Sequence, residues 1–104
     1  MPEIQITVKD KVAQIVGTPV IVCGNSDYKI NFSFDSEWGD YTAKTMRLRF
    51  YPNGVLRRYD AVFTGNTVAL PALYDIPEVE IGVYAGNIRT TTPARVQCDT
   101  VITD

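Results

Sequence analysis

The stretch Val79-Glu-Ile-Gly-Val-Tyr-Ala-Gly-Asn-Ile-Arg-Thr-Thr-Thr-Pro93 decides the class of fold. Its first half alternates valine and isoleucine with Glu80 and Gly82, which is the period-two pattern of a strand with one buried face. Gly86-Asn87 follows as a tight turn, because glycine readily takes the positive φ that a type II′ hairpin requires at its first central residue. A second β-rich run returns over residues 88–92. The stretch therefore predicts a β-hairpin, and it contains no residue suited to acid–base or nucleophilic chemistry.

The rest of the chain repeats this pattern. Turn-forming residues recur at short intervals, and between them residues 4–8, 28–34 and 46–50 alternate apolar with polar side chains. Short strands in regular succession are typical of a β-sandwich or barrel. We therefore predict a single antiparallel β-sandwich of about eight short strands. The exception is residues 70–74, where Pro71 is placed to begin a short helical connection.

The composition indicates one globular domain over residues 1–104. Hydrophobic residues make up 45% and charged residues 21% of the chain, which argues against disorder. The net charge of −2 gives no electrostatic basis for binding a nucleic acid or an anionic membrane, both of which require clustered basic charge. No apolar run approaches the roughly 18 residues of a membrane span. The N-terminus lacks the basic and apolar segments of a signal peptide, so we expect synthesis in the cytoplasm without export.

The chain contains no histidine. This absence removes Ser-His-Asp and Cys-His catalysis, histidine metal sites and the commonest general base near neutral pH. An enzyme would have to rely on carboxylates, lysine, tyrosine or thiols. We therefore expect a protein without catalytic residues, without cofactors and without a metal site.

Cys23, Trp38 and Cys98 are spaced like the cysteine–tryptophan–cysteine framework of immunoglobulin domains. The likeness is weakened by Trp38, which lies in the acidic segment Asp-Ser-Glu-Trp-Gly-Asp rather than in an interior strand. A cytoplasmic protein also normally keeps its thiols reduced. We therefore expect Cys23 and Cys98 to be two free thiols.

The acidic segment around Trp38 allows three interpretations. Asp35, Glu37 and Asp40 would suit a calcium ion, but the regular alternation and the closing glutamate of an EF-hand are missing. The same carboxylates would suit glycoside cleavage, although nothing in the sequence sets their separation. We expect instead a polar connection in which Trp38 folds its ring over an edge of the core.

The sequence Pro52-Asn53-Gly54 predicts a turn between two strands. Proline has no N–H to donate in a two-residue hairpin, so a type I turn with the glycine in the left-handed region fits better. This turn would pair Phe50 with Leu56 and Arg49 with Arg57.

That register places three arginines and two tyrosines on one face of a hairpin: Arg47, Arg49, Arg57, Tyr51 and Tyr59. Arg49 opposite Arg57 is a like-charge pair, which costs stability unless an anion or a partner lies nearby, and arginine and tyrosine are enriched at binding hot spots. The face is therefore a candidate contact patch for another protein or a sugar, and a solvated face screened by salt is the alternative. Arg58 falls on the apolar face in this register, which indicates either a shift of one residue or a strand at a sheet edge.

Three blocks of the sequence are similar to a module common in tailed phages and prophages of Gram-positive bacteria. They are Thr64-Gly-Asn-Thr-Val-Ala-Leu-Pro71, residues 79–94, and Gly24-Asn-Ser-Asp-Tyr-Lys-Ile-Asn-Phe-Ser-Phe-Asp35 with the following Glu37-Trp38. The module typically occupies the N-terminal part of virion structural proteins such as baseplate, tail-fibre or head-fibre components. The resemblance implies an immunoglobulin-like β-sandwich whose role is attachment to the virion. It also implies either a small stand-alone virion protein or the N-terminal portion of a longer one.

Residues and resemblance together predict a non-enzymatic structural or adaptor protein of a phage or prophage particle, located in the virion and made in the cytoplasm of the bacterial host. Its expected partners are other virion proteins, and the symmetry of phage particles favours a homo-oligomer, for example a trimer. Neither a nucleic acid nor a membrane is expected as a partner. The predicted interaction patch, which adjoins an exposed strand edge, consists of Arg47, Arg49, Tyr51, Arg57, Tyr59 and Trp38.

Two alternatives remain open. A carbohydrate-binding module has the same class of fold and stacks aromatic rings on sugars; Tyr51, Tyr59, Tyr84 and Trp38 are available for a host-surface glycan. A histidine-free hydrolase would use the carboxylates of the acidic segment.

Overall fold

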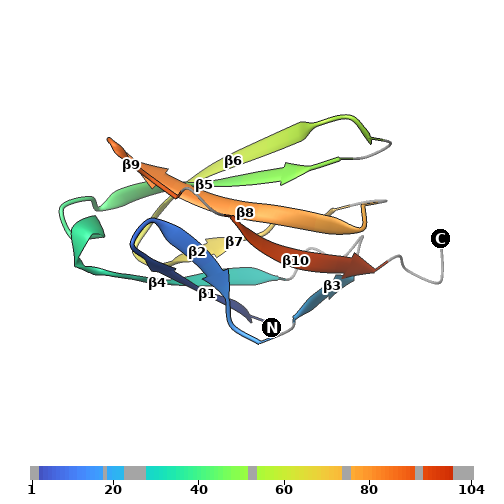
Figure 1. The fold of residues 1–104 in the computed structure, drawn as a ribbon, viewed down its shortest axis with the longest axis horizontal. Coiled ribbons are helices and arrows are strands. Elements are labelled where there is room, and N and C mark those ends of the chain that lie inside the picture. Colours follow the sequence, from blue (N-terminus) through green and yellow to red (C-terminus); the bar gives the residue numbers. More distant parts are fainter. Residues whose placement is uncertain are drawn as a thin grey trace.

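Two β-sheets pack face to face (Figure 1). The computed structural model describes residues 3–17, 19–22, 28–51, 54–73, 76–90 and 93–99. These residues form ten strands and one short 3-10 helix: β1 (Glu3–Lys9), β2 (Val12–Ile15), β3 (Val20–Val22), β4 (Lys29–Phe34), η1 (Ser36–Trp38), β5 (Ala43–Phe50), β6 (Arg57–Thr64), β7 (Thr67–Ala69), β8 (Glu78–Ala85), β9 (Ile88–Arg89) and β10 (Ala94–Asp99). The predicted all-β sandwich is confirmed.

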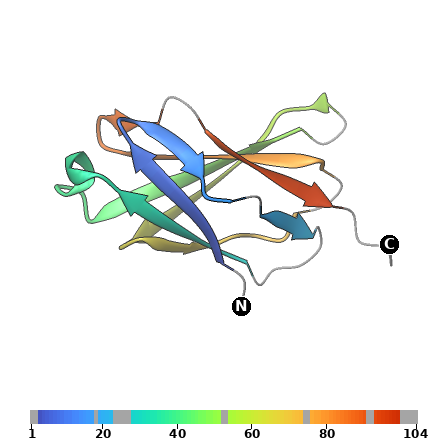
Figure 2. The same cartoon turned by 60° about the horizontal axis from the view of Figure 1, so that its bottom comes forward.

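The first sheet has the strand order β2-β1-β4-β7, and the second has the order β3-β10-β8-β5-β6, with β9 also paired to β8. Figure 2 shows the chain crossing repeatedly between the two layers. Among the described pairs, β1–β4 and β10–β3 are parallel and the others are antiparallel. The sheets are therefore not purely antiparallel, because β4 rejoins the first sheet beside β1 only after the chain has contributed β3 to the second.

The core lies between the sheets and is built from side chains at alternate strand positions. These side chains are at most 2% exposed: Ile4, Ile6 and Val8 of β1, Ile30 and Phe32 of β4, Met46 and Leu48 of β5, and Val79, Ile81 and Val83 of β8. Full burial of an aliphatic or aromatic side chain of this size contributes roughly 1.5–3 kcal/mol. The alternation in the sequence therefore identifies the buried faces correctly.

The hairpin at Gly86-Asn87 forms as predicted between β8 and β9. Gly86 has a φ of 55°, and Asn87 does not have a positive φ, which is the combination of a type II′ turn. A Cβ atom at Gly86 would lie only 2.6 Å from Cε1 of Tyr41. Glycine is therefore required here by the backbone conformation and by the neighbouring ring.

The connection from β7 to β8 is not helical, in contrast to the prediction for residues 70–74. Residues 70–73 have no helical structure, and Tyr74 lies outside the described residues. The N–H of Leu70 donates to the carbonyl oxygen of Tyr28 at 3.0 Å, and the side chains of Leu70 and Leu73 are buried. The chain crosses from one sheet to the other here, and extended backbone covers more distance per residue than a helix does.

Ten strands are present where about eight were expected. β3, β7 and β9 have three residues or fewer, which is too few to produce a recognisable alternation in the sequence. The helix η1 is a single short turn. No helix within the described residues is both long and apolar enough to pass through a membrane.

The pairing of β5 with β6 differs by one residue from the prediction. Phe50 lies opposite Arg57, and Arg49 lies opposite Arg58. Leu56, predicted to pair with Phe50, remains in the loop before β6. A shift of one residue moves every side chain of a strand to the other face of the sheet. The composition of the predicted contact patch therefore changes.

The turn that precedes β6 agrees with the prediction where it is described. Gly54 has a φ of 78°, and its N–H donates to the carbonyl oxygen of Tyr51 at 3.3 Å. Pro52 and Asn53 lie outside the described residues. The type of turn therefore stays a prediction.

Candidate functional site: an arginine-lined groove

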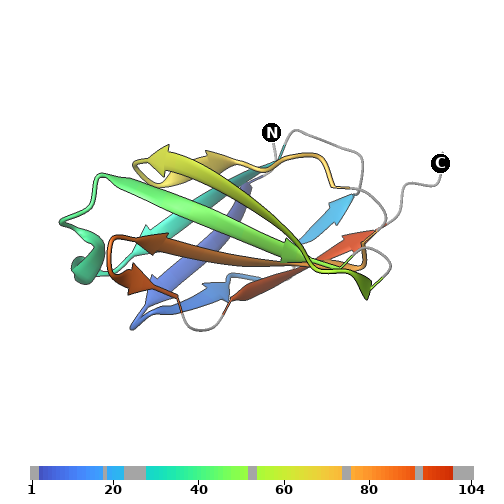
Figure 3. The same cartoon turned by 90° about the horizontal axis from the view of Figure 1, so that it is seen from above.

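The outer face of the six-stranded sheet carries an open groove of about 300 Å³. The groove extends over β6, β5, β8 and the end of β9, and Figure 3 views the molecule from this side. Its charged lining consists of Arg47, Arg49, Arg58, Arg89 and Glu80. Arg47, Arg49 and Glu80 alternate with buried residues of β5 and β8, and Arg58 and Arg89 pair with outward-facing residues of those strands, so all five point away from the core.

One row of charges crosses the sheet from edge to centre. Arg58 of β6 lies opposite Arg49 of β5, which lies opposite Glu80 of β8, which in turn lies opposite Arg95 of β10. Oε1 of Glu80 is 3.1 Å from Nη2 of Arg49, and its Oε2 is 3.0 Å from Nη2 of Arg95. The two guanidinium groups leave the Glu80 side chain only 11% exposed. Both carboxylate oxygens of Glu80 are thus within ion-pair distance of an arginine, and Arg58 is not part of this ion pair.

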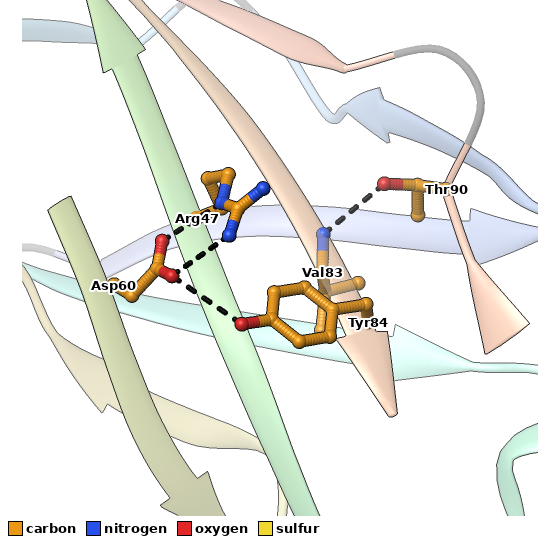
Figure 4. A network of polar contacts seen from close by, with 5 residues as sticks. All are labelled: Arg47, Asp60, Val83, Tyr84 and Thr90. Atoms are coloured by element: carbon orange, nitrogen blue, oxygen red, sulfur yellow. Dashed lines mark hydrogen bonds and ion pairs between the residues drawn. The ribbon is translucent and has the colours of Figure 1, made fainter. Parts of the chain in front are cut away.

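Arg47 and Asp60 form a second, two-pronged ion pair across β5 and β6 (Figure 4). Nε of Arg47 donates to Oδ1 of Asp60 at 2.9 Å and Nη2 donates to Oδ2 at 3.0 Å; the hydroxyl of Tyr84 donates to the same Oδ2 at 3.3 Å. The hydrogen bond from Arg47, with its positive charge, holds the pKa of Asp60 below its ordinary value of 3.8 against the opposing effect of partial burial. Asp60 is therefore a firmly ionised anchor at neutral pH.

The aromatic ring of Tyr84 is in contact with two cations. The guanidinium carbon of Arg47 is 5.1 Å from the ring centroid and that of Arg89 is 5.8 Å from it. Such contacts are attractive because the ring face is negative. Tyr84 thereby holds two arginines of the groove in position, one on each neighbouring strand.

The floor of the groove depends on Gly82 and Thr90. The N–H of Thr90 donates to the carbonyl oxygen of Val83 at 3.0 Å, and Oγ1 of Thr90 accepts from the N–H of Val83 at 3.1 Å (Figure 4). Just beyond the end of β9, the Thr90 hydroxyl thus accepts a hydrogen bond of the kind that a backbone carbonyl accepts within a sheet. A Cβ atom at Gly82 would lie 2.9 Å from this Oγ1. Glycine therefore permits the contact and keeps the floor of the groove low.

The groove is positive although the whole chain has a net charge of −2. Four arginines and one glutamate line it, and Asp60 beside it is already paired with Arg47. Among the described residues, Arg58 and Arg89 have no carboxylate partner. Guanidinium groups match carboxylates and phosphates in shape and charge. The arrangement is therefore suited to binding an anion.

The structure brings together only part of the predicted patch. Arg47 and Arg49 lie in the groove. The prediction that Arg57 and Tyr59 share their face is wrong, because both pair with core-facing residues of β5 and thus lie on the other side of the sheet. Tyr51 follows the end of β5, is 48% exposed and does not line the groove.

Trp38 belongs to the core. It is 1% exposed, and its ring centroid is 5.1 Å from that of Phe34. The expectation that its ring folds over an edge of the core is confirmed, and its inclusion in the contact patch is wrong. An apolar ring of this size next to a strand end is more stable buried than presented to solvent.

The acidic segment around Trp38 supports the β1–β2 turn. Asp10 and Lys11 have φ values of 52° and 65°, as a type I′ turn requires. Oδ2 of Asp35 accepts from the N–H of Asp10 at 2.9 Å, and Oε1 of Glu37 is 3.0 Å from Nζ of Lys11. Asp40 is exposed. Within the described ranges, no three or more carboxylate or cysteine side chains are grouped so as to hold a metal ion.

The two cysteines are not both described. The side chain of Cys98 is buried in β10, whereas Cys23 lies outside the described residues. The expectation of two free thiols therefore remains a prediction.

Besides Arg89, four charged residues of this face were absent from the predicted patch: Arg58, Asp60, Glu80 and Arg95. Glu80 and Arg95 alternate with buried residues of their own strands, so the outward direction of each was readable from the sequence. The outward direction of Arg58 and Asp60 follows only from the correct register of β6. The cross-strand neighbours of all four follow only from the order of strands in the sheet.

Comparison of the chain with protein-family models, with curated proteins and with solved structures gave no match. The resemblance to virion modules therefore receives no support from these comparisons.

Proposed function

We propose that the chain is a non-enzymatic attachment module of a phage or prophage particle, where it joins virion proteins through protein–protein contacts. Its location would be the virion, and its partners would be other virion proteins or further copies of itself, for example in a trimer. The sequence resemblance supports a place in a baseplate, tail fibre or head fibre and an immunoglobulin-like arrangement of the sandwich.

The observation that supports this function most is the open edge at β6. β6 has eight residues, and β5 is its one neighbour among the described strands; Figure 1 shows no strand on its other side. Residues 61–64 carry no charge, and Val62 is 74% exposed. Natural sheets usually protect such an edge with charges, proline or a covering segment. The first half of β6 carries such charges at Arg57, Arg58 and Asp60, whereas the uncharged second half, residues 61–64, fits the addition of a strand from a partner protein.

The region before β6 extends this surface. Val55 and Leu56 are 55% and 41% exposed, and both lie in the loop that leads into the strand. Exposed aliphatic side chains next to a free edge provide the apolar contacts that strand addition alone lacks. The edge and its loop therefore form one continuous candidate contact surface.

The sugar-binding alternative has less support. Of the four aromatic residues available for it, Trp38 is buried and the ring of Tyr84 is occupied by two guanidinium groups. Tyr51 and Tyr59 remain exposed for stacking. A glycan array decides between the two functions, since sugar binding that is lost in the Tyr51→Ala, Tyr59→Ala double variant would favour the carbohydrate-binding module.

Particles purified from the bacterium that encodes the chain test the proposed function. After prophage induction, we expect the tagged chain to co-purify with the particles through a density gradient. Val62→Lys should lower its recovery, because a lysine at the edge opposes strand addition. Val16→Lys makes the same change at a valine that is 53% exposed elsewhere, and it should have no effect. Recovery of the wild-type chain solely outside the particles contradicts the proposal.

The genes next to that of the chain provide a second check. Capsid, tail or holin genes would support a role in the virion. A metabolic operon would contradict it.

A further inference from the structure

We infer that the groove binds an extended acidic peptide segment of a partner protein. The inference names the chemistry of one partner and therefore rests on the proposed role in protein attachment. Arg58 and Arg89 line the groove and form no ion pair among the described residues, although Arg58 is close enough to Asp60 to lower its pKa. The chain has a net negative charge, yet this exposed surface leaves two guanidinium groups without an ion-pair partner. Such a surface is complementary to the carboxylates of another molecule.

The separation of the two arginines sets the length of the ligand. Arg89 lies in the same cross-strand row as Val62 of β6, and Arg58 lies four residues before Val62 in that strand. Three strand spacings of about 4.8 Å across the sheet and four rises of about 3.3 Å along it give a backbone separation of roughly 20 Å. A single phosphate or carboxylate held beside the backbone at one of these positions does not reach the backbone at the other. An extended segment of about six residues spans this distance.

The centre of the groove favours widely spaced charges. Glu80 lines one side of the groove, in the same cross-strand row as Arg58, and Asp60 stands beside the groove. A polyphosphate or a nucleic acid carries a charge on every unit and would place some of its charges next to these carboxylates. A peptide can place uncharged residues at this point, over the low floor that Gly82 provides. The groove therefore favours an acidic peptide over a dense polyanion.

Arg49 provides a third contact for such a ligand. Its guanidinium group is 3.1 Å from Oε1 of Glu80, yet this oxygen accepts no hydrogen bond. The contact is therefore an electrostatic attraction without hydrogen-bond geometry. The Arg49 side chain is also 42% exposed. A ligand carboxylate placed between Arg49 and Arg58 would receive hydrogen bonds from both. It would also relieve the repulsion between two arginines that lie directly opposite each other.

Binding of a fluorescein-labelled acidic hexapeptide with an uncharged centre, Glu-Glu-Gly-Gly-Glu-Glu, followed by anisotropy at low and at physiological salt, tests the inference. We expect Arg58→Gln and Arg89→Gln each to weaken binding about fivefold, as the loss of one charge-assisted contact would. Arg57→Gln is the matched control, because Arg57 is the adjacent, exposed arginine on the other face of the same strand. It should change binding by less than about twofold. The emission of Trp38, the one tryptophan and a buried one, verifies that each variant is folded.

Three outcomes overturn the inference. The first is the absence of binding of the acidic hexapeptide by the folded wild-type chain at low salt. The second is an equal loss in Arg57→Gln, which would show non-specific attraction between charges. The third is tighter binding of a six-unit polyphosphate than of the acidic hexapeptide, with the same dependence on Arg58 and Arg89, which would assign the groove to a phosphate polymer.

The result for the groove is separable from the result for the proposed function. Normal recovery of the wild-type chain in particles without peptide binding contradicts the inference alone. Absence of the wild-type chain from particles contradicts the proposed function, whatever the peptide measurement shows.

Discussion

Arg47 of β5 binds both carboxylate oxygens of Asp60 in β6, at 2.9 and 3.0 Å, across the strand pair whose register the sequence pattern does not determine. β6 is an edge strand, and Phe63 is its one buried side chain. A shift of β6 by one residue would move Asp60 to the other face and away from Arg47. The ion pair therefore contributes to the choice of register as well as to the groove.

Replacing Asp60 by asparagine should reduce stability at neutral pH but not in strong acid. The folded-state pKa of Asp60 lies below its ordinary value of 3.8, so its contribution is complete above that value and is lost as the pH falls through the folded pKa. The side chains of Arg47 and Asp60 are more than one-third exposed. We therefore expect Asp60→Asn to lower the free energy of unfolding by about 0.5–1 kcal/mol at pH 7. Urea denaturation of both proteins from pH 7 to pH 2 measures it.

The control for this experiment is Asp40→Asn. Asp40 is exposed and makes no described hydrogen bond or ion pair. Its replacement should leave the free energy of unfolding nearly unchanged at both ends of the pH range. If the difference between the wild type and Asp60→Asn is as large at pH 2 as at pH 7, the ion pair is not its source.

Replacing Thr90 by valine should weaken the end of the hairpin. The hydroxyl of Thr90 accepts the N–H of Val83 at 3.1 Å, and valine has the same shape without the acceptor. An unpaired, partly buried N–H costs about 1–3 kcal/mol. Amide hydrogen exchange should accelerate at Val83, and Thr90→Ser, which keeps the hydroxyl, should restore most of the protection. Unchanged exchange at Val83 in Thr90→Val would show that the hydrogen bond contributes nothing.

Replacing Trp38 by alanine should act on stability. The side chain is 1% exposed, and truncation of a buried tryptophan typically costs about 3–5 kcal/mol. Trp38→Phe should lose less, because a phenylalanine ring retains part of the packing against Phe34. Far-UV circular dichroism in urea is the appropriate measurement, since the variants lack the fluorescent probe. A loss below about 1 kcal/mol in Trp38→Ala would place the ring outside the core.

The buried faces of most strands were predictable because burial leaves a pattern in the sequence. β1, β5 and β8 alternate apolar and polar residues with one face in the core, and the structure buries those apolar residues. β6 has no such pattern, since nearly all of its side chains are exposed. Register is determined by the hydrophobic pattern where one face is buried, and an edge strand with two exposed faces lacks this constraint. The one-residue error in β6 follows from this.

The groove was less predictable than the core, because it depends on contacts between distant segments. Arg49 and Arg58 become neighbours only through the register of β6, and Glu80 meets Arg95 only because β10 follows β8 in the sheet. Arg47 and Arg49, which the sequence places on one face of β5, both lie in the groove. The carboxylates that pair with two of them come from two other strands, and no spacing within β5 indicates them.

Replacing Gly86 by alanine should destabilise the hairpin more than the same change at another glycine with positive φ. At Gly86 the φ is 55° and a Cβ atom would lie 2.6 Å from the ring of Tyr41, whereas at Gly65 the φ is 75° and no atom lies within 4 Å of that position. The left-handed conformation costs alanine about 1–2 kcal/mol at both sites, and displacement of the Tyr41 ring adds to the cost at Gly86 alone. Urea denaturation of Gly86→Ala and Gly65→Ala measures the difference between their losses of stability. In the Gly86→Ala, Tyr41→Ala double variant, the extra loss caused by Gly86→Ala should largely disappear. Equal losses at the two glycines would show that Tyr41 moves aside without cost, and glycine at position 86 would then be required by the turn alone.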